Sequence, residues 1–183
     1  MWVHLMVIKH VLRPATSLDS QEVWRLFSLP SVFERLAMEP LNLSIDDEAR
    51  YLRMNFTRDY HLFIIESANS RRPMGIAGLH SVSLDSCRTV TVLRPEYWGQ
   101  GVGSEVRQRV CCYAMKVLGL QRVFSRALAC NPGALGVLRK SGAVPISSRE
   151  VVIRNERHLV LDHVQPSSAG VSLGVVHCAC GHV

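Results

Sequence analysis

The stretch LRPEYWGQGVGSEVRQRV, residues 93–110, places three glycines at alternate positions between an apolar run and a charged segment. Gly99, Gly101 and Gly103 can adopt conformations that are closed to other residues, and they let a ligand approach the main chain closely. Apolar residues recur at helical spacing after them, and the first amides of a helix lack intrahelical partners. A strand, a glycine loop and a helix N-terminus therefore predict an anion site, with phosphate as the first candidate.

Two familiar phosphate loops fit this stretch poorly. A P-loop requires Lys and then Ser or Thr after its last glycine, whereas the chain continues Gly103-Ser104-Glu105. A dinucleotide-binding fingerprint requires GxGxxG, and its last glycine position holds Ser104 or Val106 here. On the GxG pattern alone, a glycine-rich turn without a ligand is an equal alternative.

The composition predicts one domain with a tail. The 183 residues are 48% hydrophobic and 20% charged, and we expect a domain over residues 1–165 and an uncharged flexible tail over 166–183. The net charge of +6 favours anionic partners, but no dense Lys/Arg block or reader motif accompanies it, so we expect no nucleic-acid function. Neither a secretory signal nor a window of transmembrane length is apparent. We therefore predict a cytoplasmic protein with mostly free thiols and no membrane partner.

Hydrophobic periodicity predicts alternating strands and helices around one sheet. Strands are expected over residues 10–16, 60–67, 74–84, 87–94, 122–129, 143–153 and 157–164. Helices are expected over residues 17–29, 31–38, 44–56, 102–118 and 131–142. Asn131 is the expected N-cap of the last helix, with Pro132 at its first position and Gly142 after its end. This order predicts a mixed α/β fold.

A second motif narrows the ligand. The glycine loop is followed about thirty residues later by NPGALGVLRKSGA, residues 131–143, and the pair resembles the GNAT superfamily of acyl-CoA-dependent N-acetyltransferases. In the second motif, the spacing of the family's Asn-led helix is matched at Asn131, Ala134, Lys140 and Gly142. The segments RPEYWGQG and VLRKSG are similar to the Rim-type branch, which acetylates ribosomal-protein N-termini. The resemblance covers residues 11–164.

The resemblance implies a fold and a cosubstrate. It implies one central, mostly antiparallel sheet flanked by helices, with strands splayed at the site of acetyl-CoA. It also implies that a bulge in the strand before the loop can aim an amide at the thioester oxygen. Asn131 would contact the pantetheine arm or only cap its helix. The other implied contacts are the loop amides of Gln100, Gly101, Val102, Gly103 and Ser104 for the pyrophosphate and the strand backbone at Val92 and Leu93 for the pantetheine arm.

The general base is the least determined part of the implied site. Amine attack on a thioester needs a neutral amine, and Arg88 stands where Rim-like members often carry a Glu. His80 on the neighbouring strand is the first candidate because an imidazole titrates near neutral pH; a purely structural histidine is the alternative. Asp85 and Glu66 are weaker candidates, since either would need a raised pKa.

Other departures from the family pattern affect packing and proton supply. Trp98 replaces a common Gln or Arg, although Trp is familiar in the Rim-like branch, and Ala143 replaces a Phe. Leu138 fills the slot where many members have a Tyr that protonates the thiolate, so another group or water would supply that proton.

The cysteines and the tail predict no metal site. Cys111 and Cys112 are expected to pack within a helix, and Cys130 lies beside Asn131, near the expected cofactor thiol. The tail ends in HCACGHV, which offers four soft ligands, but its spacing matches no common zinc knuckle. A tail without a metal is therefore favoured.

Together these features predict an N-acetyltransferase that moves an acetyl group from acetyl-CoA directly to a primary amine. The acceptor would be a protein N-terminus or a small-molecule amine, and the protein a monomer or homodimer. A non-catalytic CoA-binding or protein-interaction module is the alternative, motivated by Arg88 and Leu138.

Overall fold

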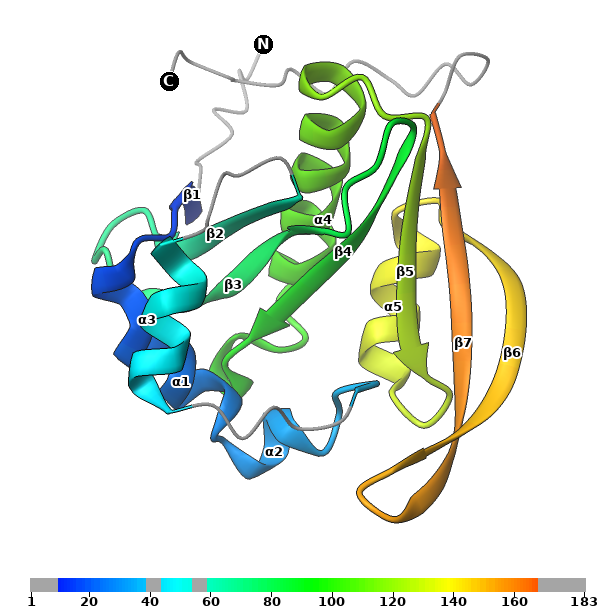
Figure 1. Cartoon of the computed structure of the whole chain (residues 1–183), viewed down its shortest axis with the longest axis horizontal. Helices are drawn as coiled ribbons and strands as arrows, with labels where there is room; N and C mark the ends of the chain where they lie inside the picture. Colours follow the sequence, from blue (N-terminus) through cyan, green and yellow to red (C-terminus); the bar gives the residue numbers. More distant parts are fainter. Residues whose placement is uncertain (1–9, 39–43, 54–58, 168–183) are drawn as a thin grey trace, which may run out of the picture.

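The computed structural model describes residues 10–38, 44–53 and 59–167, which form one mixed sheet with helices on both faces (Figure 1). In these ranges the sheet has seven strands in the order β1-β2-β3-β4-β5-β7-β6. The strands are β1 (His10–Pro14), β2 (Tyr60–Ser67), β3 (Pro73–His80), β4 (Ser86–Leu93), β5 (Arg122–Leu128), β6 (Val144–Ile153) and β7 (Glu156–Pro166). All neighbouring strands are antiparallel except β4 and β5. The predicted fold class is confirmed.

Two hydrophobic cores lie on opposite faces of the sheet because strand side chains alternate between faces. The helices are α1 (Ser20–Phe27), α2 (Pro30–Phe33), α3 (Ile45–Arg53), α4 (Val102–Cys112) and α5 (Pro132–Lys140). The front face packs against α1, α2 and α3 through Val23, Leu26, Val32, Leu52, Leu62, Ile64, Ile76 and Val92. The rear face packs against α4 through Ala77, Leu79, Cys87, Val102, Val106, Val110, Cys111 and Val123.

The parallel pair β4–β5 is joined at one end only. Its register comprises Ser86↔Arg122, Cys87↔Val123 and Arg88↔Phe124. Beyond this junction β4 continues along β3, while β5 continues along β7, so the two strands diverge (Figure 1). The expected splay is therefore observed. The β3–β4 register runs from Gly75↔Leu93 to His80↔Arg88 without a shift, so the bulge expected in β4 does not interrupt this pairing.

Helix boundaries differ from the predictions where local hydrogen bonds compete. Pro30 opens α2 at its first turn, and α2 is only four residues long rather than spanning 31–38. The helix expected from residue 17 begins as a short 3-10 turn before α1, in which Asp19 accepts a hydrogen bond from the backbone N–H of Thr16 at 2.8 Å. The helix expected over 102–118 is α-helical to Cys112 and continues as a π-helical turn, Tyr113–Val117. None of the helices in the described ranges reaches the length and hydrophobicity that a membrane-spanning segment needs.

A buried arginine ties the rear helices to the second half of the sheet. Arg107 on α4 is 2% exposed and has no carboxylate partner among the described residues. Its guanidinium donates to Ser141 Oγ at 2.8 Å and to Ser125 Oγ at 2.9 Å. It also donates to Gln165 Oε1 at 2.6 Å and to Cys111 Sγ at 3.2 Å. These bonds connect α4 to β5, to β7 and to the C-terminal end of α5.

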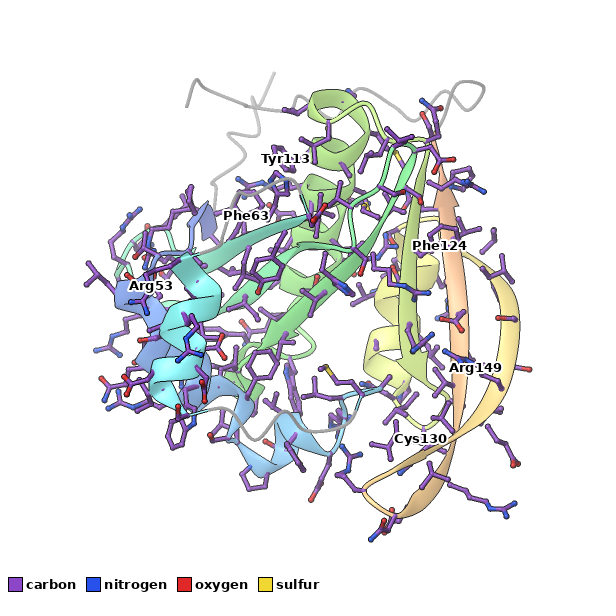
Figure 2. The ribbon with its side chains drawn as sticks, viewed as in Figure 1. Arg53, Phe63, Tyr113, Phe124, Cys130 and Arg149 are labelled. Atoms are coloured by element: carbon purple, nitrogen blue, oxygen red, sulfur yellow. The ribbon has the colours of Figure 1, made fainter. Side chains whose placement is uncertain are left out.

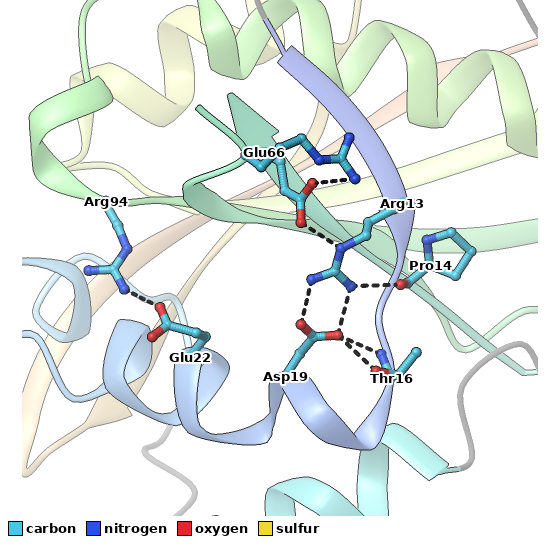
Figure 3. Close-up of polar contacts among 8 residues, drawn as sticks. Arg13, Pro14, Thr16, Asp19, Glu22, Glu66 and Arg94 are labelled. Atoms are coloured by element: carbon cyan, nitrogen blue, oxygen red, sulfur yellow. Dashed lines mark hydrogen bonds and ion pairs between the residues drawn. The ribbon is translucent and has the colours of Figure 1, made fainter. Parts of the chain in front are cut away.

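A second arginine network joins β1, β2 and the start of α1 (Figure 3). Arg13 donates to Asp19 at 2.6 and 2.8 Å and to Glu66 at 2.6 Å. Burial alone would raise the pKa of Asp19, but hydrogen bonds from Arg13 and Thr16 outweigh burial and lower it. The stability gained from the ionised Asp19 is therefore present at neutral pH and is lost as the pH falls through that lowered pKa.

Arg13→Ala is expected to lower the free energy of unfolding by about 2 kcal/mol at pH 7. The side chains of Asp19 and Glu66 are only 11% and 6% exposed, so both carboxylates would lose a donor that water replaces poorly. Arg25→Ala is the matched control: Arg25 forms an exposed helical pair with Glu22, and its loss should cost less than about 0.5 kcal/mol. Urea unfolding of the two variants measures the difference, and equal losses would contradict the prediction.

Candidate active site

The glycine loop leads from the free end of β4 into α4. Gly99 and Gly101 have φ of +73° and +83°, in the left-handed region where other residues are strained. A Cβ at either position would meet no atom within 4 Å, so conformation rather than crowding within the chain requires glycine there. Gly101 is the N-cap of α4, and Gln100 Nε2 anchors the loop by donating to Glu96 O at 2.6 Å.

The first amides of α4 are available to a ligand. The first bonds of the helix run from Ser104 N and Glu105 N to Gly101 O, at 3.1 and 3.2 Å. The preceding amides of Gly101, Val102 and Gly103 find no acceptor among the described residues. Together with the helix dipole, these amides give the N-terminus of α4 a partial positive charge, as expected for the anion site that the sequence predicts.

Gly103 has a different task from the two glycines before it. A Cβ there would lie 3.2 Å from Val137 Cγ2, which is a tight contact. Its small size therefore lets α4 approach α5, and this packing role was not foreseen from the sequence.

The direction of the backbone N–H and C=O groups along β4 decides which residues face the gap between β4 and β5. Arg94 N donates to Met74 O at 2.9 Å, so these residues form a hydrogen-bonded pair. Because such pairs alternate along an antiparallel ladder, Val92 bonds to β3, whereas the polar groups of Thr91 and Leu93 point toward β5. The predicted contact at Val92 is thus directed away from the splay and that at Leu93 toward it. Leu93 O also accepts the indole N–H of Trp98 at 2.8 Å, which fixes the end of β4.

Asn131 caps α5 as predicted, because its Oδ1 accepts from Ala134 N at 3.1 Å. Its Nδ2 donates to Arg35 O at 3.3 Å, so the side chain also joins α5 to the segment after α2. Cys130 is an exposed free thiol at the turn between β5 and α5 (Figure 2).

His80 lies on the front face at the end of β3, opposite Arg88 on β4. Its Nδ1 is 3.1 Å from Ser81 Oγ. Burial, followed by the charges of Arg88 and Arg126, lowers the pKa of His80 below 6.5, so the imidazole is neutral at pH 7. On the rear side of the same junction Cys87 and Ser125 are buried, whereas His80 and Arg88 on the front face are only half-buried.

Neither weaker base candidate fits that role. Asp85 pairs with Arg122, and this hydrogen bond lowers the pKa of Asp85, whereas a base there would need a raised pKa; that hypothesis is wrong. Glu66 accepts from Arg13 and lies 3.0 Å from Arg71, near the opposite end of β2 from the strand position that pairs with His80.

Three arginines from separate strands lie around Asp162, and one of them, Arg88, stands opposite His80. Arg88, Arg126 and Arg149 lie 3.7, 3.0 and 3.6 Å from the carboxylate of Asp162. They come from β4, β5 and β6, around β7, and Figure 2 shows Arg149 on the outer side of the sheet, away from β4. Sequence reasoning missed this cluster, because only the strand pairing brings these residues together.

A sequence model of the acetyltransferase (GNAT) domain matches residues 9–144, which is most of the chain. The chain belongs to the GNAT acetyltransferase family. It is 25% identical over 139 residues to the uncharacterized N-acetyltransferase YoaA of Bacillus subtilis (strain 168), covering 72% of this chain and 77% of YoaA. Membership makes this protein an acetyl-CoA-dependent N-acetyltransferase.

Solved structures share the GNAT fold. The spermidine N-acetyltransferase of Vibrio cholerae in complex with CoA and spermine has a TM-score of 0.79 at 19% identity, with 87% of this chain and 96% of that chain covered. A GNAT acetyltransferase of Bacillus anthracis has a TM-score of 0.73 at 17% identity, with 86% and 95% covered. These likenesses show the fold alone. The predicted Rim-type branch is not confirmed, since the similar structures include spermidine N-acetyltransferases.

Leu138 leaves this GNAT acetyltransferase without a tyrosine in the expected slot. Its side chain is 5% exposed and packs with Ala127 and Ala143, so it belongs to the core beneath α5. Within the described ranges, no group of three or more His, Cys, Asp or Glu side chains is placed to hold a metal ion. The tail ligands His177, Cys178, Cys180 and His182 lie outside those ranges.

Proposed function

We propose that this protein transfers acetyl from acetyl-CoA directly to a primary amine at the front side of the β4–β5 junction. The observation that supports this is one continuous path: the outward-facing backbone of β4 runs from the junction to the unpaired amides of α4. No covalent enzyme intermediate is needed, because the amine can approach from the front face while the donor lies between the strands.

The path accommodates an extended donor. Its phosphates would bind the amides of Gln100, Gly101, Val102 and Gly103, while the Ser104 amide, predicted with them, donates to Gly101 O within the helix. The pantetheine arm would bond to the backbone of Thr91 and Leu93. From Leu93 to Arg88 the strand covers about 16 Å at the usual rise per residue. The thioester would therefore lie near the junction, beside His80.

His80 is proposed to accept the proton of the attacking amine. Its lowered pKa keeps it neutral, and so able to accept a proton, at pH 7. Leu138 has no proton to give, and the leaving thiolate would take one from water. The acceptor is a protein N-terminal amine, as in the Rim-type branch, or a small-molecule amine, the class to which the spermine bound in the structural neighbour belongs.

The test combines acetyl-CoA binding by calorimetry with release of free CoA thiol in the presence of peptides, polyamines and amino acids. We expect binding together with turnover of at least one acceptor. Binding without turnover of any acceptor would instead support a non-catalytic CoA-binding module. Failure to bind acetyl-CoA would overturn both functions.

Gly101→Ala is expected to weaken acetyl-CoA binding about tenfold, which corresponds to about 1.4 kcal/mol. A side chain at φ +83° is strained, and the loop would relax by turning the nearby amides away from the donor. Gly119→Ala is the control, because Gly119 has φ +73° and equal open space but follows the π-helical turn at the far end of α4. Equal losses of affinity in both variants would contradict a role for the loop.

A further inference from the structure

The arginine cluster, Arg88, Arg126 and Arg149, carries more positive charge than its surroundings neutralise. Asp162 is the one carboxylate within 4 Å of these guanidiniums among the described residues. Three fixed cations against one anion leave a surplus of two positive charges on a single face of the sheet. Like charges held this close repel one another unless an anion joins them.

The cluster also has unused hydrogen-bond donors. Only Arg126 Nε bonds to Asp162, at 3.0 Å, while the contacts of Arg88 and Arg149 are longer than a hydrogen bond. No other acceptor for the three guanidiniums occurs in the part of the chain that the structure describes. Their side chains are 41%, 30% and 52% exposed for Arg88, Arg126 and Arg149, so a ligand can reach the planar donor edges.

Neighbouring titratable groups do not cancel this charge. His80 is neutral at pH 7 and lies beside Arg88. Further along the strands, Asp85 is paired with Arg122. At the other end of the sheet, Glu156 lies 3.7 Å from His158. No second carboxylate of the described residues therefore lies against the cluster.

The phosphates of the donor do not account for the cluster. They would bind at the N-terminus of α4, beyond Leu93, whereas Arg88 lies at the junction about 16 Å away along β4. The cluster instead lies on the front face, where Arg88 stands opposite His80, the imidazole proposed to receive the proton of the acceptor. An anion bound there belongs to the acceptor.

We infer that the acceptor is an amine that also carries a carboxylate, and that Arg88, Arg126 and Arg149 bind this carboxylate. The inference rests on the proposed acetyl transfer and names its substrate class. Guanidinium groups bind carboxylates through paired hydrogen bonds, and the surplus charge would repel a polyamine. A peptide that begins with glutamate, or a free acidic amino acid, has the required chemistry.

The experiment compares two peptides that differ in one group, Glu-Ala-amide and Gln-Ala-amide, with spermidine as a third acceptor. We expect kcat/KM to be about tenfold higher for the glutamate peptide and lowest for spermidine. Arg149→Gln should raise the KM for the glutamate peptide, so that the preference falls toward unity. Arg157→Gln is the control, because Arg157 is 83% exposed on the same hairpin and pairs with Glu150. Equal rates for both peptides, or a preference for spermidine, would overturn the inference.

A binding measurement separates this inference from the proposed function. Calorimetry with CoA present compares the acetylated peptides Ac-Glu-Ala-amide and Ac-Gln-Ala-amide, and it requires no turnover. Tighter binding of the glutamate form, lost in Arg149→Gln, supports carboxylate recognition even if no acceptor is acetylated. Equal binding of the two forms contradicts it, even if transfer to some amine is observed.

Discussion

His80→Gln is expected to lower kcat about 100-fold while leaving the affinity for acetyl-CoA unchanged. Glutamine keeps a polar side chain of similar reach but cannot accept a proton at neutral pH. The amine would then have to lose its proton to water after or during attack. The loss should appear in kcat more than in KM, because the proton moves only as the new bond forms.

The pH dependence gives the more specific readout. Because the pKa of His80 is lowered below 6.5, protonation of His80 should reduce the wild-type kcat further as the pH drops through that lowered value, in addition to the loss caused by protonation of the acceptor amine. His80→Gln should lack this acidic limb. His158→Gln is the control, since His158 lies on β7 and its Nε2 is 3.7 Å from Glu156 rather than beside the junction. A wild-type acidic limb that persists in His80→Gln would assign the base to another group.

Arg107→Ala is expected to lower the free energy of unfolding by about 4 kcal/mol. The change removes a buried side chain and leaves Ser125, Ser141 and Gln165 without the donor that joins them. In a protein of this size, the midpoint temperature should fall by about 10 °C. Urea and thermal unfolding at pH 7 both measure this loss.

A second substitution separates charge from volume. Arg107→Met fills most of the space and buries no charge, so it should cost about 2 kcal/mol less than Arg107→Ala. Arg109→Ala is the control on the same helix, because Arg109 is half-buried and, among the described residues, donates to His10 O alone, at 3.2 Å. A loss from Arg107→Ala no larger than that from Arg109→Ala would show that the bonds of Arg107 do not hold the rear helices in place.

Local patterns in the sequence predicted most elements and the glycine loop that leads into α4. The glycines at 99 and 101 predicted a loop at the start of a helix, and Asn131 predicted a cap, because both depend on neighbouring residues in the chain. The backbone direction of Val92 could not be predicted, because it depends on the register with β3. The arginine cluster could not be predicted from the sequence for the same reason. Arg88 and Arg149 lie far apart in the chain, and the strand order β4-β5-β7-β6 brings them together.

The short pairing between β4 and β5 also determines where the protein can change shape. Three residue pairs at the junction hold the two halves of the sheet together at one end, and beyond these pairs β4 and β5 no longer pair with each other. Any rotation of one half of the sheet against the other would change the distance between β4 and β5 least at Arg88 and most at Leu93. The end at which acetyl would be transferred is therefore the fixed end, and the end at which the phosphates would enter is the adjustable one. A donor could thus enter and leave by widening the outer end, while the groups around the reacting amine keep their positions.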